Sequence, residues 1–136
     1  MKTPPAADLA RLLLRATLAI LILLHGIAKL RHGVGPIADM VASHGLPPAF
    51  GYLVYVGEVL APLLVLIGIW TRPAALIVAI NMGVAVLLVH TKQLLELGSQ
   101  GGWALELQAM YLSAALAIAL LGAGRYSVAG ASGKWN

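Results

Sequence analysis

The sequence predicts an all-α polytopic membrane protein, a four-transmembrane-helix up-down bundle that forms one domain over residues 1–136. The chain is 60% hydrophobic and 10% charged, whereas globular domains carry about 25% charged residues. Four apolar runs, each close to the ~20 residues that cross a bilayer, occur at about 9–30, 49–70, 73–90 and 103–122. The short connections between them favour antiparallel neighbours.

The composition argues against several classes of function. The nine Lys and Arg residues are spread along the chain, mostly at the predicted span ends. The net charge of +4 is therefore explained by basic residues that orient the spans in a membrane, and it does not indicate a nucleic-acid partner. The chain has no cysteine, which excludes disulfides and thiol chemistry of its own. It also has no Gly-rich dinucleotide fingerprint, and no spacing of ligands that predicts a metal site.

The first run, 9–30, follows a polar lead-in whose prolines oppose a helix. Asp8 is placed to cap the helix that follows. The stretch 26–28 loosely resembles a signal-peptide cleavage site, but the length of the run and the apolar runs after it favour a retained span. His25 and Lys29 lie four residues apart near its end and share one helix face.

The next segment, 31–50, is an outer connection with a predicted short interfacial helix over 36–43. Pro36 lies in the first turn of that helix and Gly45 follows its end. In the second span Glu58 falls near the middle of a ~30 Å hydrocarbon core. Pro62 lacks the N–H that would bind the Glu58 backbone carbonyl. The Glu58 carboxylate and this unpaired carbonyl are therefore expected at the same depth in the membrane.

The third span begins after a tight turn at 71–73 and is apolar except for Asn81, an expected interhelical contact, and His90 at its end. Residues 91–102 form the second outer connection. The fourth span carries Glu106 and other polar residues in its first turns, residues 122–126 end it, and the tail after residue 126 is expected to be loosely ordered.

The basic residues predict the orientation of the bundle. One side would carry Lys2, Arg11, Arg15, Arg72, Arg125 and Lys134, and the other Lys29, Arg31 and Lys92. Cytoplasmic ends carry the excess of Lys and Arg, which predicts an inner-membrane protein with both termini in the cytoplasm. We interpret Arg15 and Arg72 as orientation charges.

This topology brings polar residues from four segments to the outer end of the bundle. The candidate catalytic cluster is His25, Lys29, Glu58 and Glu106. Lys29 is expected to pair with Glu58 or Glu106, because an unpaired charge at that depth costs several kcal/mol. Simpler interpretations are that Lys29 extends to the interface and that His90 is solvated there.

Several stretches along the chain carry a family resemblance. They are HGIAKL (25–30), GLPP (45–48), GEVLAPLLVLIGIWTRPAAL (57–76), GGW (101–103) with Glu106 after it, and GAGRYSV (122–128). This ordered set resembles the DoxX family of small bacterial and archaeal membrane proteins. The family positions that map onto this chain are His25, Lys29, Glu58, Arg72, Trp103, Glu106 and Arg125. The chain departs at Pro62, where glycine-rich packing is expected in relatives.

The resemblance implies four helices, a membrane location and quinone-linked redox work. A candidate quinone site then contains His25, Lys29, His90 and Trp103, although Trp103 also fits an interfacial aromatic belt. The chain would depend on a partner redox protein for electrons, and it could form a homo-oligomer. Two alternatives stay open: transport of a small solute, proton or ion, and a membrane scaffold that recruits redox-defence enzymes.

Overall fold

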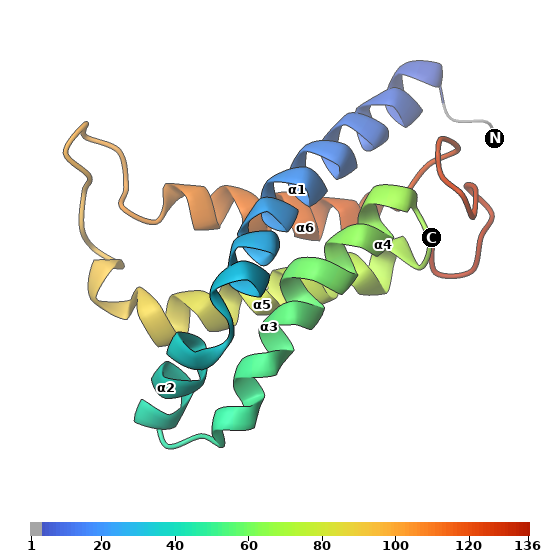
Figure 1. Cartoon of the computed structure of the whole chain (residues 1–136). Coiled ribbons are helices and arrows are strands. Elements are labelled where there is room, and N and C mark those ends of the chain that lie inside the picture. Colours follow the sequence, from blue (N-terminus) through green and yellow to red (C-terminus); the bar gives the residue numbers. More distant parts are fainter. Residues whose placement is uncertain (1–3) are drawn as a thin grey trace.

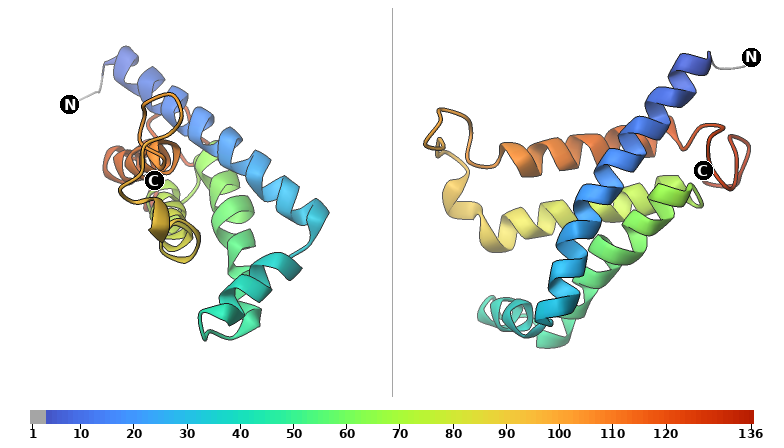
Figure 2. Two further views of the ribbon diagram at one scale, coloured as in Figure 1. Left: turned by 90° about the vertical axis from the view of Figure 1, so that its left-hand side faces the viewer. Right: turned by 45° about the horizontal axis from the view of Figure 1, so that its top comes forward.

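The computed structural model describes residues 4–136, which form two layers of paired helices. In one layer α1 (Pro5–His32) packs against α4 (Ala61–Ile67), and in the other α5 (Thr71–Val89) packs against α6 (Glu106–Leu121). The two layers cross obliquely (Figures 1 and 2). The all-α prediction is confirmed. The four-span up-down bundle is not, because such bundles keep their helices near-parallel.

The second predicted span is a continuous helix whose hydrogen-bonding pattern changes along its length. It consists of the 3₁₀ helix η1 (Pro48–Tyr52), α3 (Leu53–Tyr55), the π-helical segment η2 (Val56–Leu60) and α4. The Ala61 N–H donates to the Val56 carbonyl, five residues back. Pro62 provides the physical reason, because it has no N–H to continue the α-helical pattern from Glu58. Such π turns occur frequently at functional sites.

The short helix expected in the first connection is present as α2 (Gly35–Ser43). Pro36 lies in its first turn, as the pattern indicated. Gly33 at φ 79° ends α1, and a left-handed φ there favours glycine. α2 folds back over η1 and brings its apolar side chains to one end of the α3–η2 segment.

The core lies where the two layers meet, and small side chains dominate it. Its fully buried members include Ala19 and Ile22 of α1, Val65 of α4, Ala75 of α5 and Ala115 of α6. Alanine lets helix backbones approach closely, which suits packing in a membrane, where van der Waals contact drives association.

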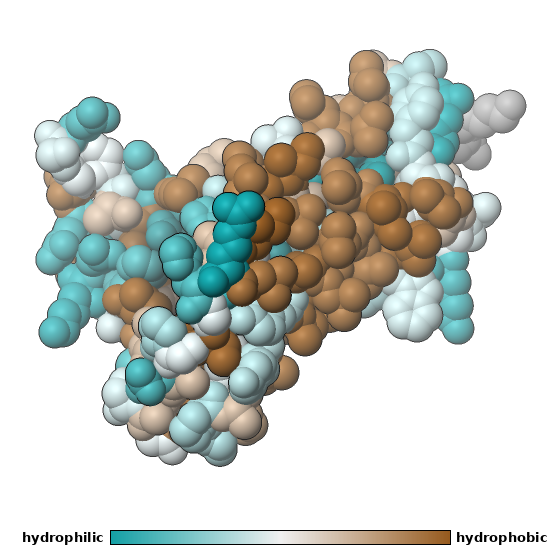
Figure 3. All heavy atoms as spheres, in the orientation of Figure 1, coloured by the Kyte–Doolittle hydropathy of each residue, from teal (hydrophilic) through white to brown (hydrophobic). Residues whose placement is uncertain are grey.

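Within residues 4–136, two helical stretches are long and apolar enough to cross a membrane, 48–67 and 71–89, while α6 is apolar but shorter. Much of the surface is also hydrophobic. Figure 3 shows hydrophobic residues in a broad band over α1 and α4, with hydrophilic residues gathered mainly toward the ends of the molecule. Exposed apolar area of this extent marks contact with lipid or protein.

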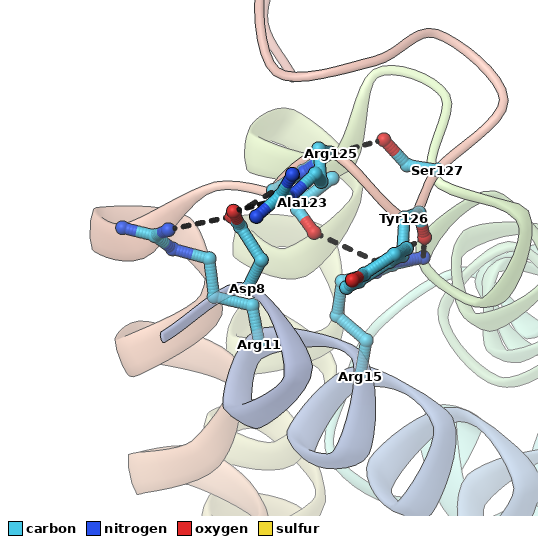
Figure 4. A network of polar contacts seen from close by, with 8 residues as sticks. Asp8, Arg11, Arg15, Ala123, Arg125, Tyr126 and Ser127 are labelled. Atoms are coloured by element: carbon cyan, nitrogen blue, oxygen red, sulfur yellow. Dashed lines mark hydrogen bonds and ion pairs between the residues drawn. The ribbon is translucent and has the colours of Figure 1, made fainter. Parts of the chain in front are cut away.

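Arg15 is a buried anchor, which corrects its interpretation as an orientation charge. Its side chain is 1% exposed, and its guanidinium donates to the carbonyls of Val65, Leu66, Ala123 and Tyr126 at 2.9–3.4 Å. Figure 4 shows it beneath the chain segment that follows α6. Two of these carbonyls belong to the last turn of α4, where helices leave carbonyls unpaired.

Arg72 has a similar role at the end of α6, again in place of a simple orientation charge. It donates to the carbonyls of Ala119 and Leu120 at 3.0 and 2.6 Å, and to that of Asn136 at 3.3 Å. The Asn136 side chain accepts from Thr71 Oγ1 at 2.6 Å. The tail is therefore hydrogen-bonded to the helices, which contradicts the loose order expected for it.

Asp8 also differs from its expected role as a helix cap. α1 already begins at Pro5, with Pro4 at the N-cap position, because proline is tolerated in the first turn. The buried Asp8 carboxylate binds the Arg125 side chain at 3.1 Å and Arg11 at 3.0 Å (Figure 4). It thus ties the start of α1 to the segment after α6.

Candidate functional site

The centre of the site is an ion pair between α1 and the π-helical segment. Lys29 Nζ lies 2.5 Å from Glu58 Oε1, and Asn81 Nδ2 of α5 donates to the same oxygen at 3.3 Å. The Glu58 side chain is 4% exposed and that of Lys29 is 34% exposed. Three elements therefore meet at one buried carboxylate. The sequence left open whether Lys29 pairs with Glu58 or with Glu106, and in the structure its partner is Glu58.

Two glycines allow this close meeting. A Cβ on Gly26 would overlap the backbone carbonyl of Glu58, so α1 passes directly over the π-helical segment. A Cβ on Gly57 would lie 2.5 Å from Asn81 Cγ. Glycine is the residue that permits such approach of a backbone. Both glycines lie within the sequence stretches that carried the family resemblance.

A large apolar cavity ends at the ion pair. Its volume is about 680 Å³, within the range of about 300–1,000 Å³ typical of sites for small molecules. Hydrophobic side chains of α2, of the η1–α3–η2 segment and of α5 form most of its wall, including Met40, Phe50, Val54, Ile80 and Val84. Its polar residues are Lys29, Glu58, Asn81 and His90.

A smaller cavity of about 160 Å³ touches the same ion pair. Residues of α1, α5 and α6 line it together with Glu58, and four residues are common to both cavities, namely Lys29, Glu58, Ala85 and His90. His25 lines only the smaller one, beside Gln108 and Tyr111. The rings of His25 and Tyr111 meet edge to face, with centroids 6.2 Å apart.

Two residues that line this smaller cavity each have a buried acceptor atom with no protein donor among residues 4–136. Glu58 Oε2 and Gln108 Oε1 are buried without a hydrogen-bond partner among residues 4–136. Such groups are rare in native structures. The Glu58 carboxylate therefore accepts hydrogen bonds from Lys29 and Asn81 through Oε1, whereas Oε2 accepts none from residues 4–136.

The structure brings together four of the residues predicted for the site and leaves two outside. Lys29, Glu58, His25 and His90 line the two cavities. Glu106 is exposed at the start of α6 beside Gly102. Trp103 lines neither cavity, and its indole Nε1 donates to the Leu94 carbonyl at 2.9 Å. The chemical roles given to all of these residues stay predictions.

Sequence reasoning did not assign three contributors to the site. Asn81 was expected mainly to join helices, and together with Glu58 to suit transport of a small solute or ion, but it was not assigned to the candidate site. Gln108 and Tyr111 are three residues apart in the first turns of α6, a spacing that places them on one face. In the described part of the chain, no three His, Asp or Glu side chains group closely enough to hold a metal ion.

Comparison with known proteins identifies one family. The family model DoxX matches residues 10–91, which include both partners of the ion pair and Asn81. Gln108 and Tyr111 lie beyond the matched residues. No curated protein and no solved structure matches the chain.

Proposed function

The chain belongs to the DoxX family, and we propose that it is an inner-membrane redox component that binds a quinone in the large cavity. The family and the apolar helices suggest a membrane protein. A multi-pass arrangement with both termini in the cytoplasm is part of the proposal. The observation that carries it is the apolar cavity of about 680 Å³ that ends on Lys29, Glu58 and Asn81.

The chemistry of a quinone fits this cavity. A quinone has an apolar ring and tail, and two carbonyl oxygens that accept hydrogen bonds. The wall of the cavity supplies apolar surface, and Lys29 Nζ and Asn81 Nδ2 supply donors at its polar end. Few polar groups in a mostly hydrophobic wall are typical of small-molecule sites.

Reduction of a quinone also needs two electrons and two protons. The sequence has no cysteine and no dinucleotide fingerprint, so we infer that a partner redox protein provides the electrons. Glu58 is placed to exchange protons at the polar end of the cavity, since its carboxylate lies against both possible donors.

Titration of the purified protein in lipid nanodiscs with a short-chain ubiquinone tests this proposal. We expect saturable binding that weakens about tenfold or more in Lys29→Met, because a hydrogen bond to a charged group contributes about 1.5–3 kcal/mol. Asn81→Leu should weaken it by about fivefold, the effect of one neutral hydrogen bond. Lys92→Met, at an exposed lysine in the connection after α5, is the matched control. Absence of saturable binding, or unchanged affinity in both site variants, would refute the proposal.

A second candidate function, passage of protons or small ions, is favoured by one observation. The two cavities meet at the same ion pair, with Lys29, Glu58 and His90 common to both. Liposomes that contain the protein would then show a flux of protons or ions that Glu58→Gln reduces. A flux no greater than that of empty liposomes would exclude this function.

A further inference from the structure

The large cavity has an exposed apolar edge between the α3–η2 segment and α5. Its wall comes from α2, from the η1–α3–η2 segment and from α5, with Lys29 of α1 at the polar end. Among residues 4–136, neither α4 nor α6 contributes to it. The lining side chains along this edge, which we call the rim, are apolar and each more than one third exposed: Leu53, Val56, Ile77, Ile80 and Val84.

The rim belongs to the two helical stretches that are long and apolar enough to cross a membrane, 48–67 and 71–89. Ile80 is the middle residue of α5, so it lies ~14 Å along the helix axis from either end. The hydrocarbon core of a bilayer is ~30 Å thick. In the proposed multi-pass arrangement the rim therefore faces the acyl chains of lipids, which suits its exposed apolar side chains.

The rim also lies next to the polar end of the cavity. Lining residues recur along α5 at spacings of three and four, which places Ile77, Ile80 and Val84 on one helix face. Asn81 follows Ile80 directly in the chain, and its amide donates to Glu58 Oε1 at 3.3 Å. A ligand whose polar head lies at the ion pair is thus one residue along α5 from the edge of the cavity.

We propose that the ligand of the large cavity is an amphiphile that enters sideways from the bilayer across the rim. Its polar head lies at Lys29 and Asn81, and its hydrocarbon tail passes between Ile80 and Leu53 into the lipid. A tail gains no hydrophobic free energy by leaving lipid, because acyl chains are as apolar as a protein interior. A lateral opening lets the tail stay in lipid while the head reaches the buried carboxylate.

Ile80 and Leu53, on opposite sides of the rim, then determine which ligands fit. They favour a head that carries a long tail over a polar solute from water, because the rim offers such a solute no hydrogen bond. That the head is a quinone rests on the proposed function, whereas the opening of the cavity to lipid does not.

Photolabelling of the ligand-free protein in nanodiscs tests the opening. The probe is a phosphatidylcholine with a diazirine at the end of one acyl chain, and we expect carbene adducts on Val54, a half-buried residue of the cavity wall. Ile80→Trp should lower this adduct by about fivefold, because the indole fills the space through which the chain passes. Leu87→Trp is the matched control: Leu87 also lies on α5 and is 66% exposed against 65% for Ile80, but it lines neither cavity.

Absence of an adduct on Val54 would overturn the proposal and show that another surface, such as a second copy of the chain, covers the rim. An adduct that Ile80→Trp leaves unchanged would overturn it too, as would one that Leu87→Trp lowers equally. If Ile80→Trp does not fold, Leu53→Trp replaces it, since Leu53 is 61% exposed on the opposite side of the rim.

Titration with two quinones separates the head from the tail. One is a ubiquinone with a long isoprenoid tail and the other is the same ring without a tail, both expressed as mole fractions in the bilayer because a tail raises partitioning into lipid. Ile80→Trp should weaken binding of the tailed quinone by about tenfold and leave that of the bare ring unchanged. Equal weakening of both would refute the tail path. Failure of both quinones to bind the wild type, with Val54 labelled, would refute the proposed function and leave an opening that lipid chains occupy.

Discussion

Loss of the Lys29 charge should destabilise the protein more than loss of the Glu58 charge. The asymmetry follows from burial, because the Glu58 side chain is 4% exposed and that of Lys29 is 34% exposed. In Lys29→Met the carboxylate stays in its buried position and keeps, among residues 4–136, only the neutral donor Asn81. In Glu58→Gln the partly exposed ammonium group can extend toward water.

The expected magnitudes follow from the same exposures. Removing one partner of a buried ion pair costs about 3–5 kcal/mol. We place Lys29→Met near 3 kcal/mol, roughly the lower limit, because water already reaches part of the lysine. Glu58→Gln should cost about 1 kcal/mol, since the new amide can still accept from Asn81. For a chain of this length about 1 kcal/mol shifts Tm by ~4 °C, which gives decreases of about 12 and 4 °C.

Thermal unfolding, followed by tryptophan fluorescence in one detergent at one pH, measures these shifts. Lys92→Met serves as control and should lie within about 0.5 kcal/mol of the wild type. The double variant Lys29→Met/Glu58→Gln leaves no charge buried, so it should be about as stable as Glu58→Gln alone. The double variant would then lose about 3 kcal/mol less stability than the two single variants together. This difference is the coupling energy of the pair, and about 3 kcal/mol is at the upper end for residues in contact. Equal Tm decreases in the two single variants, or additive ones in the double variant, would refute the reasoning.

Two further predictions concern packing. Gly26→Ala should destabilise the protein by about 2 kcal/mol, because the new Cβ would overlap the backbone carbonyl of Glu58. Gly83→Ala, where nothing lies within 4 Å, should instead stabilise α5 by about 0.5–1 kcal/mol. Tm changes of the same sign would contradict the close approach. Arg15→Lys should cost about 3 kcal/mol, because an ammonium group cannot reach the same spread of carbonyls as a guanidinium. The exposed Arg31→Lys should leave Tm within about 1 °C, and an equal effect of the two would show that Arg15 is no anchor.

Features set by local sequence could be predicted well. The apolar runs predicted an all-α chain, and Pro36 predicted the short helix α2. The mid-span position of Glu58 predicted a partner for its charge, since a lone carboxylate in an apolar span is costly. Lys29 is that partner in the structure.

Features set by distant contacts could not be predicted. Arg15 reaches carbonyls 50 and 108 residues away, and periodicity within one helix contains no information on such partners. The tail seemed polar and unstructured because its order depends on Arg72 and Thr71 in another segment. Trp103 pairs with Leu97 across a turn in the second connection, which keeps it away from the cavities that the topology suggested for it.

The π-helical segment makes the length of this span as important as its composition. Its turn holds one residue more than an α-helical turn, with hydrogen bonding across five residues between Val56 and Ala61. One residue corresponds to about 100° of rotation about a helix axis. The π turn absorbs this extra residue. A residue inserted after Tyr55, before the π turn, would instead turn the preceding segment by that angle, which would carry Phe50 and Val54 out of the cavity wall. A one-residue change in length would thus redesign the pocket while every lining side chain kept its identity.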